Sequence, residues 1–202
     1  MTELTIYFDY TDPWCYLAVF RADWLCSQAP HAQVRWHPFE LFPELPPRGA
    51  RPQNPAFLRR KIQYDVDEMT RELGIKIHVP YDRVTNSRLA LEGGRYALHH
   101  ASFDRYHRAI FAAFFQQRRD IGSLDVVAEV GAEAGLDVDD LRAALRKHRY
   151  GEEVARLRAE AADFGVVAVP TFVANNQGTV GIVAREKLLR IVTTYAPPPE
   201  RD

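Results

Sequence analysis

Residues 7–15 read YFDYTDPWC, and this stretch decides the fold. The run over residues 4–10 is rich in β-branched and aromatic residues, which is typical of a half-buried or buried strand. Asp12 is a preferred residue at a helix N-cap, and Pro13 is preferred in the first helical position. The sequence therefore predicts that a strand ends and a helix begins within a few residues, with Cys15 near the start of that helix.

The segments on either side of this junction extend the pattern. Residues 34–39 form a second short extended run after the helix, so the chain opens as β-α-β, an order that favours parallel strands. Near the other end, residues 166–173 form a β-rich run interrupted by Pro170. A turn and a second strand over residues 179–183 should follow, then a helix over 185–195.

Helices are expected between these two halves. Apolar residues recur at helical spacing up to Gly74, and further helices are expected after Asn86, over residues 103–117 and over 152–164, the last closed by Gly165. Two residues look like helix caps, Ser123 and Asp137. We predict an α/β protein with three parts in one compact unit: residues 1–45 as the N-terminal half, 46–164 as a helical insertion, and 165–202 as the C-terminal half.

Composition and charge exclude several classes of function. The formal net charge of −1, with no long basic run, argues against nucleic acid as a partner. We expect no membrane span and no signal peptide, so the cytoplasm is the expected location. The histidines show no ligand spacing: His99 and His100 are adjacent and diverge by about 100° on a helix, so no metal site is expected.

Four segments resemble one known family. Residues 8–17, 38–43, 85–87 and 165–173 are similar to the FrnE-like predicted dithiol–disulfide isomerases of the DsbA superfamily. The resemblance implies a thioredoxin-like fold with a central helical insertion. It also implies that Pro170 is a cis proline facing the helix that carries Cys15, with the backbone of Val169 exposed to a peptide-like substrate.

One departure from the family's pattern bears directly on the chemistry. Asp12 stands where a thiol–disulfide enzyme has the first cysteine of a Cys-x-x-Cys pair, so Cys15 is the only thiol of the motif. Cys26 lies eleven residues further along the same predicted helix, about 16 Å away, too far for a disulfide. We therefore expect an oxidoreductase in which any exchange is monothiol through Cys15. Glutathione or another low-molecular-weight thiol would then have to resolve the mixed disulfide, because the motif offers no second thiol. No tightly bound cofactor is expected.

Two alternatives stay open. Kappa-class glutathione transferases and 2-hydroxychromene-2-carboxylate isomerases share the architecture and have a serine at the position of Asp12. A glutathione-dependent isomerase or transferase would place Asp12, Asn86 and Val169 around the thiol ligand. The second alternative is a non-catalytic protein that binds a peptide or a thiol. The expected partner is a small thiol or the thiol or disulfide of another protein. A homodimer is a further expectation.

The candidate catalytic residues are Cys15 and Asp12, and the candidate substrate-binding residues are Pro13, Trp14, Asn86, Val169 and Pro170. Each has a plainer interpretation. Cys15 could be an inert core residue, Asp12 and Asn86 could serve only as helix caps, and Trp14 could belong to the core.

Overall fold

The computed structural model describes residues 2–52, 55–71, 73–80, 82–175 and 177–193, and the side chains of residues 55 and 57–61 are also left undescribed. Its centre is a four-stranded sheet in the order β2-β1-β3-β4. The strands are β1 (Thr2–Phe8), β2 (Ala32–Pro38), β3 (Thr171–Ala174) and β4 (Gln177–Val180). β1 and β2 are parallel, while β3 runs antiparallel to both β1 and β4. The predicted β-α-β opening and the C-terminal hairpin therefore join in one sheet.

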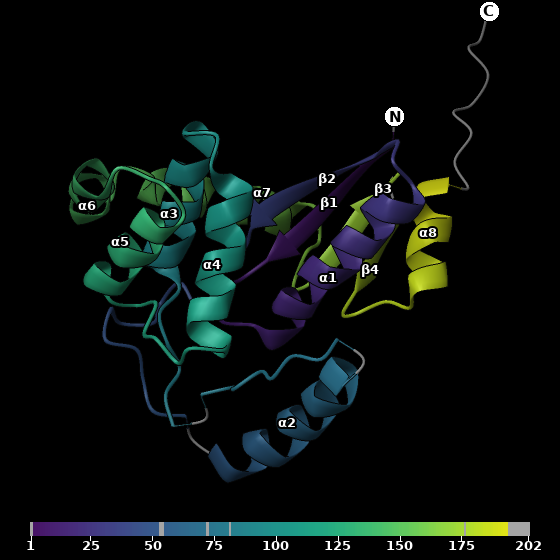
Figure 1. Cartoon of the computed structure of the whole chain (residues 1–202), viewed down its shortest axis with the longest axis horizontal. Helices are drawn as coiled ribbons and strands as arrows, with labels where there is room; N and C mark the ends of the chain where they lie inside the picture. Colours follow the sequence, from purple (N-terminus) through teal and green to yellow (C-terminus); the bar gives the residue numbers. More distant parts are fainter. Residues whose placement is uncertain (1, 53–54, 72, 81, 176, 194–202) are drawn as a thin grey trace, which may run out of the picture.

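Two helices pack beside the sheet (Figure 1): α1 (Pro13–Gln28) and α8 (Arg185–Thr193). Their apolar side chains form a cluster with the strands, in which Leu4 and Ile6 of β1 meet Leu25 of α1 and Leu188 of α8. All four are fully buried, so this cluster holds α1 firmly against the sheet.

Among the described residues, six helices separate β2 from β3: α2 (Pro55–Arg71), α3 (Arg88–His99), α4 (Phe103–Phe115), α5 (Leu124–Glu133), α6 (Val138–Arg146) and α7 (Gly151–Asp163). Helices α3 to α6 form one group beside the sheet, whereas α2 lies apart from them, below α1 in the view of Figure 1. Gly93 permits the close approach of α3 to α4, since a Cβ there would lie 2.2 Å from the hydroxyl of Tyr106.

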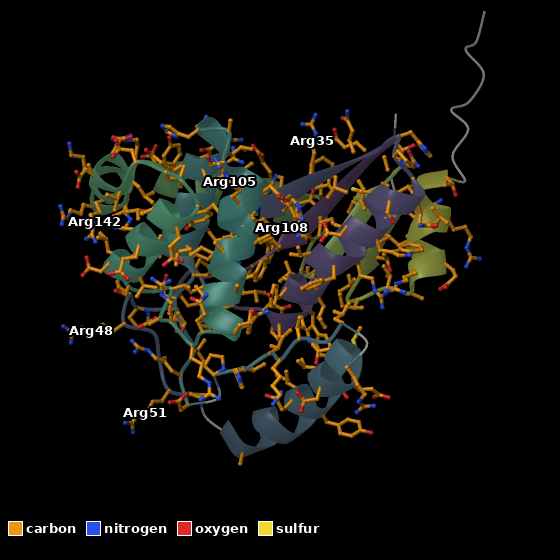
Figure 2. All side chains as sticks on the ribbon, in the orientation of Figure 1. Arg35, Arg48, Arg51, Arg105, Arg108 and Arg142 are labelled. Carbon is orange, nitrogen blue, oxygen red and sulfur yellow. The ribbon has the colours of Figure 1, made fainter. Side chains whose placement is uncertain are left out.

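The helical insertion is joined to the sheet by aromatic packing and by an ion pair. Phe8 of β1 packs among rings of α4, including Phe111 at 6.3 Å between centroids. Arg108 of α4 binds the carboxylate of Asp23 in α1 with two hydrogen bonds of 2.7 and 2.8 Å, and Figure 2 marks Arg108 on the side of α4 that faces α1. The insertion is thus packed against both α1 and the sheet.

The strand boundaries near the C-terminus differ from those predicted. The run over residues 166–173 is regular only from Thr171, because Pro170 has no N–H for a ladder and the Val169–Pro170 peptide bond is cis. β4 begins at Gln177 and ends at Val180, earlier than the predicted 179–183. The turn between them contains Asn175 with a positive φ of 52°, a conformation that asparagine tolerates. Within the described residues, no helix combines the length and apolar character that crossing a bilayer requires.

Candidate functional site

The start of α1 has the geometry that the sequence predicts. Asp12 is the N-cap, and its carboxylate accepts a hydrogen bond of 2.8 Å from the backbone N–H of Cys15. Pro13 is the first helical residue, where the missing N–H costs nothing. The capping interpretation of Asp12 is therefore confirmed, and the same contact fixes the carboxylate beside Cys15.

The carboxyl group of Asp12 titrates close to neutral pH. Burial raises its pKa to about 7, the charge of Asp9 acts in the same direction, and hydrogen bonds involving Cys15 oppose both. A carboxylate in this range can exchange a proton with a neighbouring group near neutral pH, which an ordinary surface aspartate cannot do.

Cys15 is fully buried, and this environment favours the protonated thiol. Burial raises the thiol pKa well above the ordinary value, and the negative charge of Asp12 raises it further. Cys26 is the other free cysteine, and it is exposed. Partial burial raises the pKa of its thiol, and the negative charge of Asp23 acts in the same direction. Cys15 is therefore held as a neutral thiol, so attack on a disulfide requires both access and a base.

Val169 and Pro170 lie at the end of the sheet from which α1 departs. β3 begins at Thr171, which pairs with Tyr7 near the end of β1, so Pro170 comes level with the end of that strand. Val169 and Cys15 belong to the same cluster of buried apolar side chains. The carbonyl of Pro170 is engaged, because it accepts a hydrogen bond of 2.7 Å from the N–H of Gly181. The structure thus brings Asp12, Cys15 and the Val169–Pro170 bond to one region of the molecule, with Val169 only 8% exposed.

Two further predicted residues have structural contacts of their own. Trp14 is half-buried and packs against the main apolar cluster, in keeping with a core residue at the edge of the site. The amide of Asn86 donates to the carbonyl of Leu45 at 2.7 Å and accepts from the N–H of Arg88 at 2.9 Å. Because both ends of the amide are engaged, Asn86 fixes the start of α3 in this conformation.

Sequence reasoning missed Asp9, which organises the loop between β1 and α1. Its carboxylate is fully buried and accepts four hydrogen bonds of 2.7–2.9 Å: from the N–H and hydroxyl of Thr11, the N–H of Leu41 and the hydroxyl of Ser87. Burial raises its pKa, and the four donors oppose that effect. The available signal was an aspartate placed between aromatic residues directly after a buried strand.

A buried ion pair lies next to this network and was also missed. Glu40 is 1% exposed, and both of its carboxylate oxygens accept hydrogen bonds of 2.5–2.8 Å from the guanidinium of Arg88. Its backbone carbonyl accepts from Arg158 of α7 at 2.8 Å. These contacts fasten the segment after β2 to α3 and α7.

No group of three or more His, Cys, Asp or Glu side chains in the described part of the chain could hold a metal ion.

Comparison with known proteins agrees with this architecture. The family model described as "DSBA-like thioredoxin domain" matches residues 3–192. A curated relative, the uncharacterized protein YwbO of Bacillus subtilis (strain 168), is 28% identical over 91% of this chain and 92% of its own length.

Two solved structures show the same fold. The probable DsbA oxidoreductase SCO1869 from Streptomyces coelicolor is 22% identical, with a TM-score of 0.85 over 100% of this chain and 94% of that one. A 2-hydroxychromene-2-carboxylate isomerase is 19% identical, with a TM-score of 0.75 over 95% and 93% of the two chains. The predicted α/β thioredoxin-like fold with a helical insertion is confirmed.

Proposed function

Because the chain belongs to the family of DSBA-like thioredoxin domains, we propose that it is a thiol–disulfide oxidoreductase of the FrnE-like branch that works through one thiol, Cys15, with Asp12 as its base. The observation that carries the proposal is the pairing of the two at the start of α1. Burial raises the pKa of the Asp12 carboxyl group to about 7, and it also raises the pKa of the neighbouring Cys15 thiol well above its ordinary value. A nucleophile with a high pKa is activated when an adjacent base accepts its proton during attack.

The exchange consists of two balanced steps. When a substrate disulfide reaches Cys15, the sulfur attacks one disulfide sulfur, Asp12 takes the thiol proton, and the other substrate sulfur leaves and is protonated. A mixed disulfide between Cys15 and the substrate results, and the departing group has been reduced to a thiol. A second thiol then attacks the mixed disulfide, Cys15 regains its proton, and a new disulfide is released.

The second thiol must come from outside the protein. The only other cysteine, Cys26, is exposed and lies near the opposite end of α1. Glutathione or an equivalent small thiol would fill this role, and the cytoplasm, where such thiols are kept reduced, is the proposed location.

The test is exchange between glutathione and a small disulfide, followed by the absorbance of a coupled reductase. Cys15→Ser should reduce the rate to that of the uncatalysed reaction, whereas the matched variant Cys26→Ser should retain the wild-type rate. A Cys15→Ser rate equal to that of the wild type would exclude the monothiol mechanism.

The role of Asp12 is tested separately by the pH profile. The wild-type rate should rise with pH through about 7 as the carboxyl group ionises. Asparagine is also a good N-cap, so Asp12→Asn should retain the fold. Its rate should no longer rise with pH through this range, because the variant has no carboxyl group to ionise. An unchanged profile in Asp12→Asn would assign Asp12 to capping alone.

The near-neutral carboxyl group beside a buried thiol also favours a second candidate, a glutathione-dependent isomerase or transferase of the 2-hydroxychromene-2-carboxylate isomerase type. In that case Asp12 exchanges a proton with the bound ligand, and Cys15 has only a structural role in the core. Calorimetry should then show glutathione binding that survives Cys15→Ser. An absence of heat and of thermal shift at millimolar glutathione would exclude this candidate. If both assays fail while a peptide still binds, the protein is a binding module without catalysis.

A further inference from the structure

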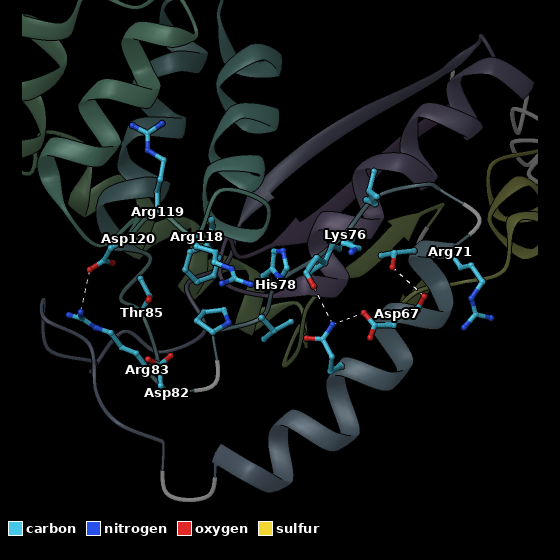
Figure 3. A pocket seen from close by; sticks show the side chains of 17 residues that line it. Asp67, Arg71, Lys76, His78, Asp82, Arg83, Thr85, Arg118, Arg119 and Asp120 are labelled. Atoms are coloured by element: carbon cyan, nitrogen blue, oxygen red, sulfur yellow. Dashed lines mark hydrogen bonds and ion pairs between the residues drawn. The ribbon is translucent and has the colours of Figure 1, made fainter.

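A groove of about 960 Å³ lies between α2 and the body of the protein (Figure 3). Neither Asp12 nor Cys15 is among the residues that line it. One wall is the side of α2 that carries Asp67 and Arg71, and the other consists of residues 75–80, 82 and 83 and of residues 118–120 after α4. Its volume is in the range of small-molecule sites. The floor is partly apolar, since Ile75 and Val79 line the groove and pack against the main apolar cluster.

Basic side chains outnumber acidic ones around the groove, five to three. Two of the five are neutralised: Arg83 pairs with Asp120 at 3.4 Å, and Arg119 pairs with two glutamates on α5. The other three basic side chains have no carboxylate partner within the described part of the chain: Arg71, Lys76 and Arg118. The groove therefore presents cationic groups that a negatively charged ligand could neutralise.

Arg118 is hydrogen-bonded to a ring nitrogen of His78. Its Nη2 donates to Nδ1 of His78 at 3.1 Å, since arginine can only donate. The backbone N–H of His78 in turn donates to the carbonyl of Phe115 at 2.7 Å. Arg118 itself has a positive φ of 59°, an uncommon conformation for a residue with a side chain. A guanidinium without a carboxylate partner among the described residues is thus positioned at the groove.

A second hollow of about 600 Å³ continues from the first and shares Asp82 and Arg83 with it. It adds Arg48 and Arg51, whose side chains project at the edge of the molecule in Figure 2. The backbone here is fixed by a two-bond bridge between Ala50 and Val84 at 2.8 and 3.0 Å. The positive surface therefore extends beyond the groove on a well-defined backbone.

We propose that this groove binds a small organic anion, with the apolar body of the ligand against Ile75 and Val79 and its carboxylate or phosphate on Arg118 and Lys76. Guanidinium groups bind planar oxyanions with paired, charge-assisted hydrogen bonds, which suits Arg118 to this role. The site is separate from the proposed exchange at Cys15 and does not depend on it.

Calorimetric titration of the full chain with terephthalate and with phenyl phosphate tests the proposal, and the uncharged analogue benzamide serves as the reference ligand. At least one of the two anions should bind, benzamide should bind at least about tenfold more weakly, and added salt should weaken the anion. Binding by terephthalate alone would assign a carboxylate ligand, and binding by phenyl phosphate alone a phosphate ester. Absence of binding by both anions at millimolar concentration, or equal binding of benzamide, would overturn the proposal.

Three variants locate the site. Arg118→Asn removes the charge and keeps a residue that tolerates the left-handed backbone, and it should weaken binding about tenfold. The Lys76 side chain is itself exposed, so Lys76→Gln should fold; it should also weaken binding, and it carries the test if Arg118→Asn does not fold. Arg146→Gln, an exposed change on α6 outside the groove, should leave binding unchanged. An equal loss in Arg146→Gln would show that only the overall charge matters and would overturn the assignment.

Discussion

Asp9 illustrates how one buried carboxyl group can position the loop that leads into α1. A carboxylate without solvent contact is costly unless its oxygens are satisfied, and four donors from three segments satisfy those of Asp9. Because Ser87 and Leu41 lie far from Asp9 in the sequence, the carboxylate joins the start of α1 to the segment after β2 and to the start of α3. The position of Asp12 depends on this junction, since Thr11 is tied to Asp9 through both its N–H and its hydroxyl.

We predict that Asp9→Ala lowers the free energy of unfolding by about 3 kcal/mol or more, because several buried donors lose their acceptor at once. Urea unfolding followed by circular dichroism measures the change. The control is Asp163→Ala, which removes an exposed carboxylate at the end of α7 and should change stability by less than about 0.5 kcal/mol. Equal effects in the two variants would contradict the role assigned to Asp9.

At the scale of single elements, the N-caps of α5 and α6 look alike in sequence but contribute differently to the stability of their helices. Ser123 and Asp137 both occupy N-cap positions with extended backbone, as predicted. Only Asp137 uses its side chain, accepting from the N–H groups of Asp139 at 3.0 Å and Asp140 at 2.9 Å. Ser123 makes no such hydrogen bond.

Asp137→Ala should therefore destabilise the protein by about 1 kcal/mol, and Ser123→Ala, the matched control, should have little effect. Thermal unfolding of both variants at the same pH measures the difference. The predicted order would be refuted by a Ser123→Ala loss as large as that of Asp137→Ala.

The attachment of the helical insertion to the sheet depends on the Glu40–Arg88 pair. Glu40 is almost fully buried while the Arg88 side chain is 31% exposed, so removal of the arginine leaves a buried carboxylate without its partner. Removing one partner of a buried ion pair destabilises the fold far more than replacing both partners with uncharged residues does.

Arg88→Gln should lower the free energy of unfolding by about 3 kcal/mol, and the double variant Glu40→Gln with Arg88→Gln should recover part of that loss. A double-mutant cycle in urea gives the coupling. Arg35→Gln, which breaks the exposed pair with Glu3, is the control and should cost less than about 1 kcal/mol. Strict additivity of the Glu40 and Arg88 changes would exclude the coupling.

At the scale of the whole molecule, the sequence predicts the order of elements because that order is a local property. Alternation along β1, the Asp12-Pro13 cap and the apolar spacing of the helices each depend on neighbouring residues. The Asp9 network cannot be predicted in this way, since Ser87 reaches Asp9 across 78 positions of sequence. The groove beside α2 is equally non-local, because α2 forms only one of its walls. The burial of Cys15, which decides its chemistry, is likewise a property of the packed molecule.

His107 of α4 makes the packing between the insertion and the sheet sensitive to acid. Its ring is buried among aromatic rings of both parts, with centroids 4.7 Å from Phe8 and 4.4 Å from Trp36, and its Nδ1 lies 3.0 Å from the hydroxyl of Tyr10. Burial lowers the pKa of His107 well below its ordinary value, and the charge of Arg108 acts in the same direction. The unfolded chain therefore takes up a proton at a higher pH than the folded protein does.

The stability linked to His107 is present above the unfolded pKa of about 6.5 and is lost as the pH falls toward the folded value. We predict that the wild-type free energy of unfolding decreases below about pH 6.5 with a contribution of up to about 1.4 kcal/mol per pH unit from this residue, and that His107→Phe removes that contribution. Urea unfolding at several pH values between about 5 and 8 measures it. The slopes must be compared rather than the absolute stabilities, since His107→Phe leaves the Tyr10 hydroxyl without its partner at every pH. The exposed His31→Gln variant should follow the wild-type slope, and a His107→Phe slope that does the same would show that the acid sensitivity arises elsewhere.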